Sequence, residues 1–379
     1  MALTVFWICC ALLIYSYVLY PLLVGVLAKR IGMPVVGDDV LRRVTIIVTA
    51  YNEANCIRAK LDNLVGLEYP RDLVQILVVS DGSSDATEEI AAGYEVRPVR
   101  VLRIDGRQGK TACQNAAALA ADGEILVFTD ATTRLQADAV RAMVSKFADP
   151  QVGCVGGRLE YVSDVDNLTG SGGEAYWSYE IRLRVGESSL GSLIGVSGCL
   201  YAVRKSAYRP IDPGLISDFA IAMKMQEQGL RTVLAPDACC HESTLEDGTR
   251  ELSMRVRVGV RSLNALVRER RFLNPVKYGR FAWQLWSHKV LRYASPFLWI
   301  GAFTANVLLI NYHVAYLVMF AGQCAIIAAG VAGFMLQDRK RDLGVLTKPY
   351  YLVLTNLASL IAALRYLRGE RMVVWTPVR

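Results

Sequence analysis

The stretch Glu124-Ile125-Leu126-Val127-Phe128-Thr129-Asp130-Ala131-Thr132-Thr133 decides how the rest of this chain is interpreted. Its apolar run between polar residues is typical of a strand buried in a sheet, although a buried helical turn has the same pattern. In open α/β sheets, ligands bind beyond the carboxyl ends of the strands. A carboxylate there, such as Asp130, can hold a cation and, through it, a diphosphate. For this stretch alone, the simpler interpretation is that Asp130 caps the following turn.

Neighbouring segments add three more strands and a set of polar residues at their ends. The predicted strands are residues 44–49, 74–79, 99–103 and 124–130. Helical patterns lie between them, and strands that alternate with helices imply βαβ units and a parallel sheet. The carboxyl ends of parallel strands meet at one edge, so we expect Glu53, Asp81 and Asp130 to gather there with Lys110. Such a set suits a nucleotide that carries a diphosphate and a metal ion.

Composition places this α/β segment between apolar ends. The chain has 379 residues, which is more than one typical core, and 53% of them are hydrophobic, with the excess near both termini. The net charge is +7, and much of the basic excess lies between residues 250 and 292. This pattern favours a membrane surface or an anionic substrate, and no recognisable nucleic-acid module accompanies it. The nine cysteines form no CxxC pair, which argues against a disulfide framework and fits a reducing cytosolic environment.

The two ends are predicted to contact the membrane. Residues 2–28 carry no charge and are long enough to span a bilayer. A signal peptide is the competing interpretation, but no basic residue precedes the run and no convincing cleavage site ends it. The basic residues that follow, Lys29 and Arg30 first, place this side in the cytoplasm and the N-terminus outside.

The C-terminal third is predicted to form interfacial helices followed by further membrane-spanning helices. Residues 251–293 are basic and amphipathic with interleaved tryptophans, which suits the headgroup layer better than a plain solvated face. Apolar runs at 294–312 and 314–336 follow, joined by a short turn. The last run, 350–364, either spans or lies at the interface. If it spans, the basic C-terminus ends outside, against the charge rule.

Several motifs, in order and spacing, resemble family 2 glycosyltransferases, which are inverting enzymes with a GT-A fold. They are Thr49-Ala50-Tyr51-Asn52-Glu53, Ser80-Asp81-Gly82-Ser83-Ser84-Asp85, Gly109-Lys110 with Asn115, Asp130-Ala131-Thr132, Ser197-Gly198-Cys199-Leu200-Tyr201-Ala202-Val203-Arg204 and Ile216-Ser217-Asp218-Phe219. The resemblance covers about residues 44–290. The flanking apolar segments match, in their order, the polysaccharide-synthase branch of that family.

The resemblance implies a role for each motif residue. Asp218 would be the catalytic base that takes the proton from the acceptor hydroxyl, and it also sits where a helix N-cap is expected. The implied donor-binding residues are Ala50, Tyr51, Glu53, Asp81, Lys110, Asp130 and Arg257. The implied acceptor-binding residues are Gly198, Cys199 and Phe219. Trp177 is a further acceptor candidate from the residues alone, because aromatics recur at helical spacing around it; such a pattern is more often packing, but aromatics near a saccharide site can stack on sugar faces. Asp130 would also bind a divalent cation, Mg²⁺ or Mn²⁺.

Two departures from the family pattern qualify these roles. Thr132 stands where the metal motif usually has its second carboxylate, which leaves the dependence on a cation open. His241 is a candidate replacement ligand, although such a histidine is more often a plain loop residue. Val258 follows Arg257 where processive members have a tryptophan that stacks on the acceptor sugar. The absence of this tryptophan favours transfer of a single sugar.

The sequence therefore predicts a membrane enzyme with an α/β GT-A catalytic domain. The expected organisation is an N-terminal transmembrane helix (1–30), a cytoplasmic catalytic domain (44–250), interfacial helices (251–293), two or three transmembrane helices (294–366) and a basic tail (367–379). Expected partners are a nucleotide sugar, most simply a UDP-sugar, a lipid-linked or glycan acceptor, membrane lipids and polysaccharide-export proteins, with no nucleic acid. The expected location is the bacterial inner membrane. Alternatives are a processive polysaccharide synthase and a non-catalytic transporter or scaffold with a degenerate nucleotide-binding domain.

Overall fold

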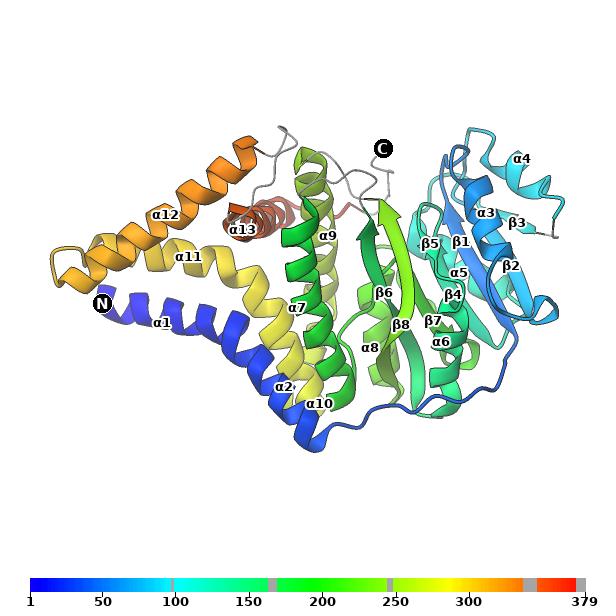
Figure 1. The fold of residues 1–379 in the computed structure, drawn as a ribbon, viewed down its shortest axis with the longest axis horizontal. Coiled ribbons are helices and arrows are strands. Elements are labelled where there is room, and N and C mark those ends of the chain that lie inside the picture. Colours follow the sequence, from blue (N-terminus) through cyan, green and yellow to red (C-terminus); the bar gives the residue numbers. More distant parts are fainter. Residues whose placement is uncertain (97–98, 163–168, 244–247, 337–345, 373–379) are drawn as a thin grey trace. The chain divides into compact units, whose positions relative to one another are not determined.

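The computed structural model describes residues 1–96, 99–162, 169–243, 248–336 and 346–372, and Figure 1 labels its elements. The chain divides into two compact units. The first comprises Met1–Arg30, Ser163–Leu183 and Thr244–Arg371, and the second comprises Ile31–Val162, Arg184–Ser243 and Met372–Arg379. The second unit contains every predicted site residue except Trp177 and Arg257.

The second unit is built on one mixed sheet. Its strands are β1 (Val44–Ala50), β2 (Val74–Ser80), β3 (Arg100–Arg103), β4 (Ile125–Asp130), β5 (Arg134–Leu135), β6 (Val152–Val162), β7 (Leu200–Arg204) and β8 (Arg231–Ser243). Their order is β3-β2-β1-β4-β7-β6-β8-β5. The first four are parallel, which confirms the predicted βαβ arrangement, and β7 runs antiparallel to both β4 and β6.

Helices cover both faces of this sheet. They are α3 (Ile57–Val65), η2 (Arg71–Leu73), α4 (Thr87–Ala92), α5 (Lys110–Ala120), α6 (Ala139–Ser145), η3 (Lys146–Ala148), η4 (Lys205–Ala207) and α8 (Ser217–Glu227). All seven residues of β1 are buried, as expected for a parallel strand covered on both sides. Ile46 of this strand packs into one core with Leu61 of α3 and Val140 of α6, while α5 packs against β1 and β2. The sheet edge that carries the motifs is thus held by a continuous core.

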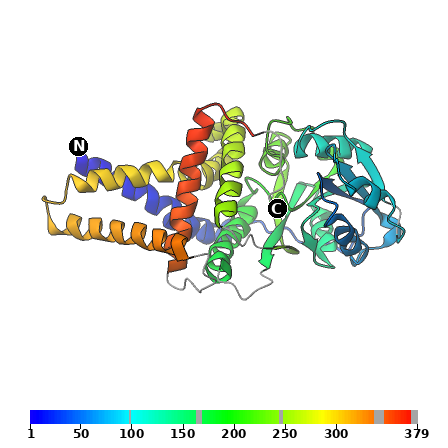
Figure 2. The same ribbon diagram turned by 90° about the horizontal axis from the view of Figure 1, so that it is seen from above.

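The first unit is helical. Its elements are α1 (Ala2–Ile14), η1 (Tyr15–Leu19), α2 (Tyr20–Ile31), most of α7 (Thr169–Leu190), α9 (Gly248–Arg268), η5 (Arg270–Leu273), α10 (Pro275–Gln284), η6 (Leu285–Val290), α11 (Leu291–Val307), α12 (Val314–Leu336) and α13 (Thr347–Leu367). Figure 2 shows α1 beside α11, and the two pack against each other.

Three helices of the described chain are long and apolar enough to cross a membrane: Ala2–Ile31, Val314–Leu336 and Thr347–Leu367. The last is 21 residues long, so the final apolar run extends beyond its predicted limits of 350–364. Helix α13 also packs closely along the basic helix α9. The approach is so close that a Cβ added to Gly259 would lie 2.7 Å from the Cβ of Ala362.

Candidate functional site

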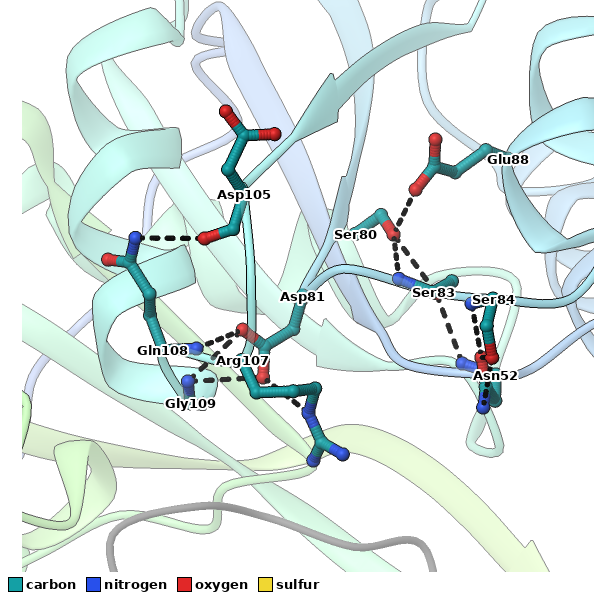
Figure 3. A network of polar contacts seen from close by, with 10 residues as sticks. All are labelled: Asn52, Ser80, Asp81, Ser83, Ser84, Glu88, Asp105, Arg107, Gln108 and Gly109. Atoms are coloured by element: carbon teal, nitrogen blue, oxygen red, sulfur yellow. Dashed lines mark hydrogen bonds and ion pairs between the residues drawn. The ribbon is translucent and has the colours of Figure 1, made fainter.

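Asp81, at the end of β2, organises the loop that leads into α5 (Figure 3). Its carboxylate accepts hydrogen bonds from the backbone N–H groups of Gln108, at 2.7 Å, and Gly109, at 3.1 Å. The Nε of Arg107 lies 3.5 Å from its Oδ2. Asp81 is only 1% exposed, and the loop needs a glycine at position 109, where φ is 89°. The predicted donor-binding carboxylate therefore also fixes the start of α5, where Lys110 lies.

Arg107 joins Tyr51 to this network. The guanidinium carbon lies 3.3 Å from the centroid of the Tyr51 ring, so the cation stacks on the aromatic face while it pairs with Asp81. Ala50, the last residue of β1, accepts a hydrogen bond from the backbone N–H of Asp81, at 2.9 Å. Tyr51, Asp81 and Arg107 form a group with one flat face and paired polar atoms, which are the features that recognise a planar heterocycle.

The turns that follow β1 and β2 hold each other. Asn52 adopts a φ of 53°, and its side-chain oxygen accepts a hydrogen bond from the backbone N–H of Ser84, at 2.8 Å (Figure 3). The backbone N–H of Glu53 donates to Thr87 Oγ1, at 2.8 Å, and the Cys56 thiol donates to Glu53 Oε2, at 3.1 Å. Glu53 is thus buried between these two turns, and its role in donor binding stays a prediction.

Lys110, Asp130 and Asp218 converge around Gly198. The Lys110 ammonium donates to Asp130 Oδ1 and to the carbonyl oxygen of Gly198, the latter at 3.1 Å. A Cβ built on Gly198 would lie 2.9 Å from Asp218 Oδ2 and 3.6 Å from Lys110 Nζ. Burial lowers the pKa of Lys110, but the negative charges of Asp130 and Asp218 help to offset this, and the pKa is raised overall. Four motifs far apart in the sequence therefore meet at this glycine.

Helix α5 also positions the segment that leads to Asp218. The Thr111 hydroxyl donates to the carbonyl of Leu215, at 2.8 Å, and the Asn115 amide donates to the carbonyl of Ile211, at 2.7 Å. Asp218 lies in the first turn of α8, which begins at Ser217. The base candidate and Lys110 are thus held by the same helix.

A buried lysine lies beneath the Asp130 turn. Lys60 of α3 is 2% exposed, and its ammonium donates to Thr129 Oγ1, at 2.9 Å, and to the carbonyl of Thr133, at 2.6 Å. Burial lowers the pKa of Lys60 to about 8, against the opposing effect of the Asp130 carboxylate. Sequence reasoning missed this residue, because a lysine within a helical pattern usually faces solvent.

Glu242 of β8 faces the same turn from the other side. The Thr132 hydroxyl donates to Glu242 Oε1, at 3.3 Å, and the Cys199 thiol lies 3.6 Å from Glu242 Oε2. Burial raises the pKa of Glu242, and the nearby negative charge of Asp130 raises it further. His241 is directed elsewhere, since its Nδ1 lies 3.6 Å from Glu160 Oε2. The carboxylate beside the predicted metal motif is therefore Glu242, which the sequence analysis did not select.

The other predicted residues are placed as follows. Phe219 is 3% exposed and packs against Gly195, so its side chain belongs to the core. Trp177 in α7 and Arg257 in α9 belong to the first unit. Within the described ranges, no group of three or more His, Cys, Asp or Glu side chains has the arrangement of a metal site made by protein ligands alone. The roles given to Phe219, Trp177, Arg257 and His241 stay predictions.

Residues 45–211 match the family model described as glycosyl transferase family 2. This segment is a family 2 glycosyltransferase domain. The match contains Tyr51, Asp81, Lys110 and Asp130 and ends a few residues before Asp218.

Two curated relatives resemble the glycosyltransferase domain and its surroundings. An N-acetylglucosaminyltransferase of Rhizobium sp. (strain N33) is 30% identical over 220 residues, which are 54% of this chain and 49% of that protein. A poly-beta-1,6-N-acetyl-D-glucosamine synthase of Staphylococcus aureus (strain MSSA476) is 26% identical over 256 residues, which are 65% of this chain and 61% of that protein. The chain thus spans less than two thirds of the length of either relative.

A solved structure resembles the whole chain in fold. The mannosyltransferase PcManGT from Pyrobaculum calidifontis, in complex with GDP-Man and Mn²⁺, matches with a TM-score of 0.72 at 24% sequence identity. The match covers 97% of this chain and 99% of that one. The likeness confirms that the glycosyltransferase domain has the predicted GT-A-like α/β fold.

Proposed function

We propose that this protein is a membrane-bound, inverting hexosyltransferase that moves a sugar from a nucleotide donor to a lipid-linked or glycan acceptor. The observation that carries the proposal is the meeting of Lys110, Asp130 and Asp218 around Gly198. A group for the donor diphosphate and a carboxylate for the acceptor hydroxyl lie on either side of a residue with no side chain. The name of one relative, a poly-beta-1,6-N-acetyl-D-glucosamine synthase, supports a role in polysaccharide synthesis, and we place that polysaccharide at or outside the cell surface.

The donor nucleotide would lie along the carboxyl edge of the parallel strands. Tyr51 and Arg107 offer a flat surface for the base, and Asp81 offers a hydrogen-bond acceptor once Arg107 shifts. The Lys110 ammonium is the cation of this group nearest to the proposed reaction centre, so it would contact the diphosphate. A UDP-sugar is the first donor to test.

A divalent cation fits the residues beside Asp130. The carboxylates of Asp130 and Glu242 and the hydroxyl of Thr132 are all oxygen donors, which Mg²⁺ and Mn²⁺ prefer. PcManGT was solved with Mn²⁺, which supports such a requirement here. When bound, the cation would offset negative charge on the leaving diphosphate.

Asp218 is the residue proposed to act on the acceptor. Inversion requires the acceptor oxygen to attack the anomeric carbon from the face opposite the diphosphate, while a base removes the hydroxyl proton. The Asp218 carboxylate would take that proton, an effect worth roughly 10²–10⁴-fold in rate. The absent side chain of Gly198 leaves space beside the carboxylate, and the Lys110 ammonium supplies positive charge on the donor side.

The apolar helices of the first unit would anchor the enzyme in the bacterial inner membrane, with the catalytic domain in the cytoplasm. Helix α9 would lie in the headgroup layer. The residue after Arg257 is Val258, so an aromatic platform for a growing chain is missing at this position. This favours the addition of a single sugar over processive synthesis.

The decisive test is a screen of nucleotide sugars for nucleoside diphosphate release by the full chain in detergent. We expect one donor to be consumed, and Asp218→Asn to abolish transfer while nucleotide binding persists. Near-normal turnover by Asp218→Asn would refute the assigned base. A non-catalytic transporter or scaffold would release no diphosphate from any donor, and the length of labelled product separates single transfer from processive synthesis.

A further inference from the structure

The register between β5 and β8 brings the turn after Asp130 against Glu242. Arg134 pairs with His241 and Leu135 with Cys240, and the two strands run antiparallel. In an antiparallel pair, a step back along one strand is a step forward along the other. The chain leading from Thr132 to Arg134 therefore passes Glu242, one residue beyond His241, where the pairing of β8 with β5 ends.

Strand alternation then selects which side chain of β8 reaches this turn. Successive side chains on a strand point to opposite faces, so His241 and Glu242 must diverge. The Nδ1 of His241 lies 3.6 Å from Glu160 Oε2, whereas Glu242 Oε1 accepts the Thr132 hydroxyl at 3.3 Å. Cys240, which pairs with Leu135 of β5, shares the face of Glu242.

We propose that Glu242 supplies the second carboxylate of the cation site, in place of the one that Thr132 lacks. The inference rests on the proposed function, because it concerns the cation that would accompany a nucleotide diphosphate. Asp130 contributes its carboxylate from β4, and Glu242 contributes the other across the sheet. Thr132 Oγ1, which already contacts Glu242, is a neutral oxygen donor between them.

The ligand chemistry suits a cation that is shared with substrate. Mg²⁺ is usually bound by one or two carboxylates, with water and substrate phosphates in the remaining positions. Asp130 is 22% exposed at its side chain and Thr132 is exposed, so an ion can enter from the solvent side.

The test is the affinity of the full-length protein for Mn²⁺ alone, measured from the electron paramagnetic resonance signal of free Mn²⁺ in detergent solution. Glu242→Gln keeps the shape of the side chain and removes its charge, so we expect affinity to fall at least about tenfold. The control is Glu160→Gln, which removes a charge beside His241; its affinity should stay within about twofold of the native value. His241→Gln should behave like this control.

A compensating variant makes the test specific to ligation. Thr132→Asp in the Glu242→Gln background restores a carboxylate at the motif position and should recover the affinity for Mn²⁺. If Glu242→Gln does not fold, Glu242→Asp still applies: it keeps the charge but shortens the side chain by one methylene, so it should also weaken Mn²⁺ binding.

Three results would overturn the inference: native affinity in Glu242→Gln, an equal loss in Glu160→Gln, or a loss confined to His241→Gln. In the fallback experiment, native affinity in Glu242→Asp would overturn it as well. The donor screen is independent of these measurements. A chain that binds Mn²⁺ as expected but releases no nucleoside diphosphate would lose the proposed function and keep the cation site.

Discussion

Gly198→Ala tests whether the meeting point of Lys110, Asp130 and Asp218 is the reaction centre. The added Cβ would lie 2.9 Å from Asp218 Oδ2, whereas ordinary contacts begin near 3.4 Å. The carboxylate must therefore retreat by about half an ångström, a small movement for folding but a large one for proton transfer. A misplacement of about 1 Å can cost roughly 10²-fold in rate, so we expect kcat to fall about ten- to hundredfold.

The same segment offers a matched control for this substitution. A Cβ on Gly195 would approach Phe219 Cδ2 at 3.4 Å, which is ordinary contact, so Gly195→Ala should retain most of the activity. Steady-state release of nucleoside diphosphate, with the preferred donor and a saturating acceptor, gives kcat for both variants. Nucleotide affinity, measured by calorimetry, should change little in either, because the displaced group faces the acceptor.

Two results would refute the reasoning about Gly198. If Gly198→Ala turns over at the native rate, Asp218 is not the base or the carboxylate has room to move without effect. If Gly195→Ala is equally impaired, the loss reflects the packing of the 195–199 segment and not the position of the carboxylate. Thermal unfolding of both variants separates either result from loss of the fold.

Three further substitutions test other parts of the site. Lys60→Met removes a group whose pKa is about 8 in the folded state and ordinarily 10.5. Because the folded state binds the proton less tightly, the free energy of unfolding of the native chain should rise by about 3 kcal/mol relative to the variant between pH 8 and 10.5. Urea unfolding that shows no such difference would contradict the buried ammonium. Asp81→Asn leaves two backbone N–H donors competing for one amide oxygen and should cost about 1–3 kcal/mol of stability, with weaker nucleotide binding; unchanged thermal unfolding would contradict it. Arg107→Ala removes half of the flat surface proposed for the base and should weaken nucleotide affinity about tenfold by calorimetry. An unchanged affinity would exclude Arg107 from the base site.

Local sequence patterns predicted the parallel half of the sheet and the gathering of Asp81, Lys110 and Asp130 at its edge. Runs such as residues 44–49 and 74–79 are β-branched and bounded by polar turns, and their separation by helical patterns leaves a parallel sheet as the simplest arrangement. That arrangement alone brings Asp81 and Asp130 to one edge. The contact of Lys110 with Asp130 follows from the same reasoning, because α5 begins between their strands.

What the sequence could not predict depends on register between distant strands. Whether His241 or Glu242 faces Asp130 is a matter of a single residue along β8, since a shift by one position exchanges the two faces. The choice is made by the pairing of Arg134 with His241, a contact between segments about a hundred residues apart. Lys60 was missed for a related reason, because only the packing of α3 under the Asp130 turn shows that its ammonium is buried.

The charges around Asp130 favour the proposed divalent cation even with lysines nearby. Asp130, Asp218 and Glu242 bring three carboxylates to this region, and Lys60 and Lys110 bring two ammonium groups. Lys60 is buried beneath the turn and cannot reach a ligand, and Lys110 is already shared between Asp130 and the Gly198 carbonyl. A diphosphate that enters this group adds negative charge, and the two engaged ammonium groups are not enough to neutralise it. A divalent ion between Asp130, Glu242 and the phosphates would restore the balance, so donor affinity should depend on the cation more steeply than the missing carboxylate at Thr132 suggests.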